Sequence, residues 1–226
     1  RVTSAETAIT QNAEQIKLSA NKTEEIGTKL DNLSVGSDNL ISNGGFPTDT
    51  HGWWKTPNIA FQTSTHPFYY NGNKKLFVID SVSQSEGMVG STRFKVKRNI
   101  AYTISFVGFS SSTVKDTDVY FLGRKNGETS DWTSSKTIFA NLKMSPNGAN
   151  TYKATFNVGD CDDGYIRFDH NGTANDQVAS MFFGEIMLVE GTVAKKYQPS
   201  SADTQSQIDS TNSNLQNNYY SKTQTD

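Results

Sequence analysis

The chain has 226 residues, of which 34% are hydrophobic and 11% aromatic, and its formal net charge at pH 7 is −2. This length suffices for one large domain or for one domain with appendages. A charge so close to zero gives no general attraction to nucleic acid or to an anionic membrane, and no run of about 18 apolar residues predicts a membrane span. We therefore expect neither nucleic acid nor a membrane as a partner.

The first segment, residues 1–37, has a heptad pattern typical of a helical coiled-coil stalk. One heptad series is Val2, Ile9, Ile16, Thr23 and Leu30, and its companion series is Ala5, Asn12, Ser19, Ile26 and Leu33. A lone helix with so thin an apolar stripe is not stable in water, so the seam predicts partner helices, with a trimer favoured. The alternative is a single helix folded onto its own domain.

The middle segment, residues 38–199, has a different character. Clusters of Gly, Asn, Asp and Ser separate short runs rich in Val, Ile, Phe and Tyr, with no helical period between them. Such runs predict strands joined by tight turns. The predicted strands are 58–63, 75–81, 87–97, 100–109, 117–124, 151–158, 164–169 and 181–190. Many short strands of this kind are typical of an all-β jelly-roll sandwich.

The last segment, residues 200–226, is more polar. One heptad position is held by Ile208, Leu215 and Lys222, and the companion position by Thr204, Thr211 and Asn218, none of which is apolar. We predict a polar stalk that is helical inside an oligomer and flexible alone. Because the chain begins without Met and ends inside this polar pattern, we interpret it as a fragment of a longer protein.

Three stretches of the chain resemble a known family. NLISNGGF followed by GWW, AYTISFVGF in mid-domain and GEIMLVEGTVAKKYQPSSAD at the end look like the carbohydrate-binding module of the family 4/9 type. More specifically, they resemble the version found in tail proteins of phages and prophages of Gram-positive bacteria. The flanks AITQNAEQIKLSANKTEE and NNYYSKTQTD are similar to the stalks of such tail fibres.

This resemblance implies a jelly roll that binds glycans without cutting them, carried on a homotrimeric tail component of a virion. The implied partners are a host cell-surface polysaccharide and other tail or baseplate proteins, and the implied location is the tail tip or tail fibre. Pro47 follows Phe46 where the family often has an acidic residue, which argues against the structural calcium that many such sandwiches carry. We expect no cofactor, with structural calcium as the alternative.

Two adjacent tryptophans, Trp53 and Trp54, cannot both enter the same core from one strand, because neighbouring side chains on a strand point to opposite faces. We predict that Trp54 fills the core and that Trp53 lies at the surface. Trp132, in the polar stretch GETSDWTSSKT, and Tyr69, in HPFYYNG, are further candidates for exposure. An exposed ring is either a platform for a sugar or a contact between subunits, and both interpretations stay open.

Alternation along three predicted strands places Tyr, Arg and carboxylate side chains opposite the apolar ones. In YIRFDH, for example, Ile166 and Phe168 form the apolar set. Rings stack on the apolar side of a pyranose and charged groups bind its hydroxyls, so a face of this composition predicts saccharide binding. The alternative is an ordinary solvated sheet face with ion pairs. The candidate carbohydrate-binding residues are Trp132, Trp53, Tyr69, Tyr120, Arg124, Tyr165, Arg167, Asp169 and Glu185.

No familiar catalytic or metal-binding motif stands in the sequence. The three histidines lack the spacing of a zinc site, and the single Cys161 is interpreted as a free thiol without a role. Asp169 with Glu185 would be the candidate pair for a glycosidase, but acidic residues are common on a sheet face, so we expect no enzyme. The rival functions are a structural spacer of a tail fibre and, as a second alternative, a glycan hydrolase.

Overall fold

The computed structural model describes residues 2–31, 38–194 and 196–215. The chain divides into two compact units, Arg1–Val35 and Gly36–Asp226. In the described parts of both units, no helix is long and apolar enough to cross a membrane.

The first unit contains helix α1, Val2–Asp31. Ile9 and Ile16, which belong to one predicted heptad series, are both exposed to solvent in the single chain. Leu33 of the companion series lies outside the described residues, as do Asn218 and Lys222 near the other end. The helix is therefore confirmed, whereas a coiled coil is not shown.

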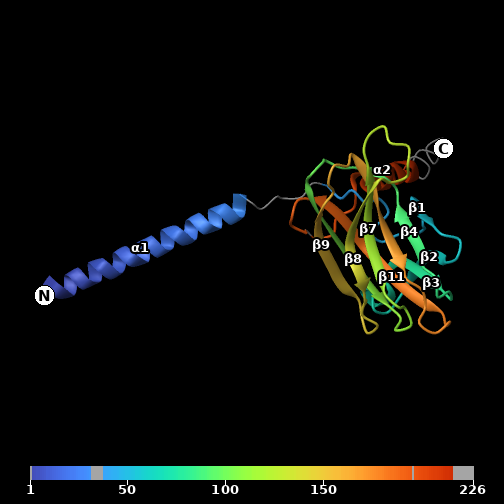
Figure 1. Cartoon of the computed structure of the whole chain (residues 1–226), viewed down its shortest axis with the longest axis horizontal. Helices are drawn as coiled ribbons and strands as arrows, with labels where there is room; N and C mark the ends of the chain where they lie inside the picture. Colours follow the sequence, from blue (N-terminus) through green and yellow to red (C-terminus); the bar gives the residue numbers. More distant parts are fainter. Residues whose placement is uncertain (1, 32–37, 195, 216–226) are drawn as a thin grey trace, which may run out of the picture. The chain divides into compact units, whose positions relative to one another are not determined.

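The second unit is built around a β-sandwich of two antiparallel sheets (Figure 1). Sheet A contains β1 (Trp53–Lys55), β4 (Gly87–Ser91), β5 (Phe94–Lys95), β7 (Thr117–Arg124), β8 (Ser134–Leu142) and β10 (Asp163–His170). Sheet B contains β2 (Ala60–Thr65), β3 (Lys75–Ser81), β6 (Ala101–Ser110), β9 (Asn150–Asn157) and β11 (Ala179–Glu190). The main strand orders are β1-β4-β10-β7-β8, with β5 also pairing β10, and β2-β3-β11-β6-β9. One 3₁₀ turn, η1 (Tyr70–Gly72), precedes β3.

The predicted sandwich is confirmed, but the sequence did not predict β1 or β8. β1 is only three residues long, too short for alternation to be recognised. β8 lies at the edge of sheet A, and none of its side chains is fully buried. An edge strand has few apolar positions to fill, so its sequence, SSKTIFANL, looks polar.

The core lies between the two sheets and is rich in phenylalanine. Phe168 of sheet A and Phe183 of sheet B are fully buried and stack with their ring centroids 4.5 Å apart. Phe106 of β6 meets Phe168 edge-on at 5.1 Å. Burying a side chain of this size contributes about 1.5–3 kcal/mol relative to leaving it exposed. These rings therefore hold the sheets together and fix which face of each sheet points outward.

The order predicted for the two adjacent tryptophans is wrong. Trp53 packs into the core, with its ring centroid 5.1 Å from that of Phe77, whereas Trp54 is 40% exposed. The reason is the register of β1 on β4, which pairs Trp53 with the buried Ser91 and Trp54 with Gly90. Residues directly opposite each other share a face, so Trp53 points inward with Ser91.

Helix α2, Ser201–Leu215, lies at one end of the sandwich (Figure 1). The Ser200 hydroxyl oxygen caps it by accepting a hydrogen bond from the Asp203 backbone N–H at 3.1 Å. Both carboxylate oxygens of Asp203 accept the backbone N–H of Asn43, at 2.9 and 3.0 Å. The first turn of α2 is thus bonded to the loop that precedes β1. The predicted boundaries between sandwich and stalks stay a prediction.

Candidate functional site

The outward-pointing side chains of sheet A form the candidate site, hereafter the outer face. β10 pairs with β7 so that Arg167 lies opposite Tyr120. Because residues directly opposite each other point to the same side, their alternate neighbours share this face as well. The outer face comprises Trp54, Tyr120, Arg124, Tyr165, Arg167 and Asp169, together with Arg93 and the loop that carries Asp131 and Trp132.

Trp54 provides an exposed ring on this face. Its indole lies directly over Gly90, at a position that any Cβ on residue 90 would overlap. The indole also meets the ring of Tyr165, with centroids 5.8 Å apart and planes at 75°. The glycine therefore creates the space in which the indole rests on the sheet, and Tyr165 fixes its edge. A ring held in this way is preorganised to stack on a flat apolar surface.

The loop between β7 and β8 supplies a second exposed indole, Trp132, which is 46% exposed. Its neighbour Asp131 ties the loop to the sheet. The Tyr165 hydroxyl donates to one carboxylate oxygen of Asp131 at 2.6 Å, and Arg93 donates to the other at 3.0 Å. Arg124 adds a hydrogen bond from its guanidinium to the Ser130 carbonyl at 3.1 Å. Tyr165 thus connects the two exposed tryptophans, touching one directly and the other through Asp131.

A buried carboxylate organises the arginines of the outer face. Asp163 accepts hydrogen bonds from Arg93 at 2.8 Å and from Arg124 at 3.2 Å. Burial acts to raise the pKa of Asp163, but Arg93, Arg124 and Lys95 outweigh it, so the pKa lies below its usual value. The Arg93 guanidinium also covers the ring of Tyr165, 5.1 Å from its centroid. These contacts fix both guanidinium groups in place, so that they scaffold the face.

A second polar group lies beside the first. Arg167 donates two hydrogen bonds to Asp169, at 2.7 and 2.6 Å, and covers the ring of Tyr120 at 5.0 Å. The Tyr120 hydroxyl donates to Asp118 at 3.2 Å. Burial raises the pKa of Asp169 to about 7; Arg167 opposes this rise and Glu86 adds to it. Asp169 is fully buried beneath its neighbours, so it positions Arg167 from below.

Three predicted site residues do not belong to the outer face. Trp53 lies in the core. Tyr69 is only 2% exposed and packs in a cluster with Leu76 and Phe109. Glu185 belongs to β11 of sheet B, where its carboxylate accepts the Tyr69 hydroxyl at 2.9 Å. Alternation indicated correctly that Glu185 faces away from the core, but it carries no information about which sheet a strand joins.

The same separation argues against the alternative of a glycosidase, for which Asp169 and Glu185 would be the candidate pair. Asp169 and Glu185 lie on strands of different sheets, and Asp169 is engaged by Arg167. In the described part of the chain, no group of three or more His, Cys, Asp or Glu side chains is placed to hold a metal ion.

Besides Trp54, which was predicted to fill the core, four residues that build the face were not predicted from the sequence. Arg93, Asp131, Asp163 and Gly90 make its hydrogen bonds or its space, as described above. For Asp163 the signal was available, since it stands two residues before Tyr165 in the same alternating strand. For the other three no local pattern exists, because their roles arise from pairing between distant segments.

The outer face combines exposed aromatic rings with hydrogen-bonding side chains, as expected of the class of β-sandwich domains that bind ligands. Within that class, residues 38–175 match the model of the family described as "Carbohydrate binding domain", of the 4/9 type. The match covers more than half of the chain, which therefore belongs to this family of carbohydrate-binding domains. The domain is itself non-catalytic, and the resemblance inferred from the sequence is confirmed at this level. No curated protein matches the chain.

Solved structures of similar fold include binding domains and a phage protein. The CBM22-1 xylan-binding domain of Paenibacillus barcinonensis Xyn10C aligns with a TM-score of 0.50 and 12% identity, covering 71% of this chain and 99% of that one. The enzymatically active domain of bacteriophage CBA120 tailspike protein 4 also gives 0.50 and 12%, covering 67% of this chain and 21% of that one. At this identity the likeness shows a shared fold. The aligned part spans about a fifth of the tailspike chain.

Proposed function

We propose that the outer face of sheet A binds a saccharide of a bacterial cell wall. The observation that carries the proposal is the exposed indole of Trp54, seated on Gly90, in contact with Tyr165 and connected through it to the loop of Trp132. Sugar rings have apolar faces that stack on such rings, while their hydroxyls accept and donate hydrogen bonds. The family match supports this ligand class.

The setting of the domain is a further part of the proposal. We place it on a tail component of a phage or prophage, as a jelly roll that contacts the host surface during adsorption. The tail-like sequence of its flanks and the fold shared with a tailspike chain support this placement. In this setting other tail or baseplate proteins are partners, and the protein is located in the virion.

We also propose that α1 forms a homotrimeric coiled coil through its heptad seam. Ile9 and Ile16 are exposed in the single chain, and packing them against two further copies would bury them. Three binding faces on one stalk raise the effective concentration of each face for a polymeric wall saccharide. Weak binding at a single face is therefore compatible with firm adsorption.

The test is binding of the full chain to a glycan array and to intact Gram-positive cell walls. We expect Trp54→Ala and Trp132→Ala each to weaken binding at least about tenfold, with folding intact by near-ultraviolet circular dichroism. Phe68→Ala is the matched control, because Phe68 is an exposed ring (44%) that packs on Phe109 of sheet B. No binding on any surface would favour a structural spacer of the tail fibre, whereas binding unchanged by both tryptophan variants would reject the outer face as the binding site.

A further inference from the structure

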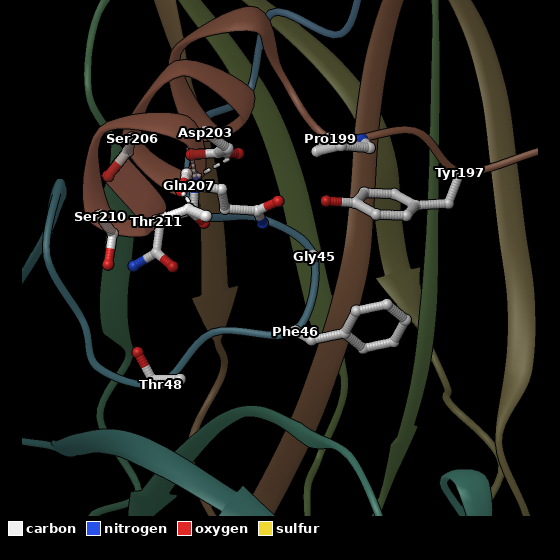
Figure 2. Close-up of a pocket in the computed structure, with 11 residues that line it drawn as sticks. Gly45, Phe46, Thr48, Tyr197, Pro199, Asp203, Ser206, Gln207, Ser210 and Thr211 are labelled. Carbon is white, nitrogen blue, oxygen red and sulfur yellow. Dashed lines mark hydrogen bonds between the residues drawn. The ribbon is translucent and has the colours of Figure 1, made fainter. Parts of the chain in front are cut away.

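A second ring cluster surrounds Phe46, in the loop that precedes β1. Phe46 meets Tyr70 edge-on at 5.5 Å and Tyr197 at 6.0 Å, and it remains 38% exposed. Phe46 and Tyr197 border a pocket of about 830 Å³ between this loop and α2 (Figure 2). Ligand sites in proteins typically measure about 300–1,000 Å³, so the pocket has the size of a binding site.

Hydroxyl and amide groups form about half of the pocket wall, and apolar groups form the rest. Besides the two rings Phe46 and Tyr197, the lining includes Thr48, Gln207, Ser210 and Thr211. Figure 2 shows the Tyr197 hydroxyl directed toward the side chain of Gln207. Among its described lining residues none is Lys or Arg, and the carboxylate of Asp203 is already bonded to Asn43. This composition suits a neutral, hydroxyl-rich ligand. The Lys74 ammonium, which lies near the pocket, is engaged over the ring of Phe46, 5.0 Å from its centroid.

Gly45 leaves room for the Tyr197 hydroxyl at the edge of the pocket. The Tyr197 hydroxyl lies against Gly45 so closely that a Cβ on residue 45 would overlap it. Burial raises the pKa of Tyr197, and Asp203 and Glu185 add to the rise. The hydroxyl therefore stays protonated at physiological pH and is able to donate a hydrogen bond to a ligand.

The backbone around this cluster is strained. Tyr70 and Glu185 both have a φ of +48°, and they are the two residues other than Gly, Asn and Asp that do so in the described chain. Strain of this kind persists where the surrounding structure requires it. Here it places Tyr70 against Phe46 and directs the Glu185 carboxylate to the Tyr69 hydroxyl.

We propose that this pocket is a second saccharide site, separate from the outer face. Phe46 and Tyr197 would contact the apolar side of a neutral sugar ring, and Gln207 with the hydroxyls of α2 would bind its hydroxyl groups. None of the pocket residues belongs to sheet A, so the site functions whether or not the outer face binds. The domain would then hold a polysaccharide at two places, or two chains at once.

The test is a titration of the ¹⁵N-labelled full chain with cellohexaose, xylohexaose and the hexamer of N-acetylglucosamine. We expect at least one of these neutral probes to shift the side-chain amide signals of Gln207 and the backbone signals of residues 43–48. The shifts persist in the Trp54→Ala/Trp132→Ala double variant, which lacks the exposed rings of the outer face.

Two variants locate the site. Ser210→Trp fills the pocket from α2 and is expected to reduce the affinity read from these shifts at least about tenfold. Asn212→Trp adds the same ring on the far side of the same helix and leaves binding unchanged. Tyr197→Phe keeps the ring over Gly45 and removes only the hydroxyl, with a smaller loss of about three- to tenfold.

Absence of shifts at Gln207 and residues 43–48 with all three probes would overturn the second site, as would binding that Ser210→Trp leaves intact. The proposals for the two sites can be rejected independently of each other. Cell-wall binding that survives the loss of Trp54 and Trp132, together with pocket shifts that Ser210→Trp removes, would reject the outer face and retain the pocket.

Discussion

Replacing each of the two adjacent tryptophans by alanine should separate stability from binding. Trp53 packs on Phe77, Phe168 and Phe183 from both sheets. Truncating an aromatic side chain in a closed core costs about 3–5 kcal/mol, because the lost transfer free energy is joined by the cost of the cavity. In a domain of this size each kcal/mol lowers Tm by about 2–4 °C, so Trp53→Ala is expected to lower Tm by roughly 10 °C.

For Trp54→Ala, the terms that contribute to the loss of stability are different. Its indole rests on the outer surface, where water refills the vacated space, so no cavity term arises. At 40% exposure, roughly 120 Å² of apolar surface is covered, which at about 25 cal/mol per Å² sets an upper limit of about 3 kcal/mol. Exposure of Tyr165 and Gly90 accounts for part of that loss. We therefore expect a smaller decrease in stability than for Trp53→Ala, together with a loss of saccharide binding.

Urea unfolding followed by circular dichroism gives the stability of both variants, and cell-wall binding is measured well below each transition. Folded Trp53→Ala should bind nearly as well as the parent chain, since its indole does not reach the outer face. Equal destabilisation by the two variants would refute the assignment of inner and outer rings. Full binding by Trp54→Ala would refute its role as a platform.

Three further predictions follow from the same face. Gly90→Ala should weaken binding without unfolding the domain, because the new Cβ displaces the indole of Trp54; unchanged binding would contradict this. Asp131→Asn should lower affinity about three- to tenfold by loosening the loop, while Tm changes little. Because the folded pKa of Asp169 is raised to about 7, its contribution to stability is full below about pH 4 and is lost as pH rises through 7. Urea titrations should therefore show that, across this range, the free energy of unfolding of the parent chain falls by up to about 4 kcal/mol more than that of Asp169→Asn. Parallel pH profiles of the two chains would refute the raised pKa of Asp169.

The proposed trimer has its own measurement. Light scattering should give three chains per particle for residues 1–226 and one for a chain lacking residues 1–37, because the apolar seam of α1 is removed. The truncation spares α2, whose first turn is bonded to the sandwich through Asp203. A monomeric full chain, or a truncated chain that remains trimeric, would contradict the placement of the contacts.

The sequence predicted those parts of the fold that depend on local patterns. Val, Ile and Phe alternate with polar residues in β7 and β10, and this alternation correctly gave the outward set of each strand. Apolar runs bounded by turn residues gave β3 and β6 almost to the residue. Both signals follow from the two-residue period of a strand, which is a property of the segment itself.

Predictions that needed pairing between distant segments failed. Alternation shows that Glu185 points away from the core, but only the strand order shows that β11 lies in sheet B rather than beside β10. Alternation likewise requires Trp53 and Trp54 to point oppositely, yet a shift of one residue in the register of β1 on β4 would exchange them. The register pairs Trp54 with Gly90, which lies thirty-six residues further along the chain, and no local sequence pattern predicts that contact.

Gly90 also shows why the candidate site depends on more than exposed rings. A larger residue there would stabilise the strand locally, since glycine costs about 0.5–1 kcal/mol in a strand interior. The sheet instead has a glycine, Gly90, where the indole of Trp54 lies on it. At the second pocket Gly45 leaves similar room for the Tyr197 hydroxyl. In both places a side chain is absent where an aromatic residue rests, so the placement of the ring depends on the glycine.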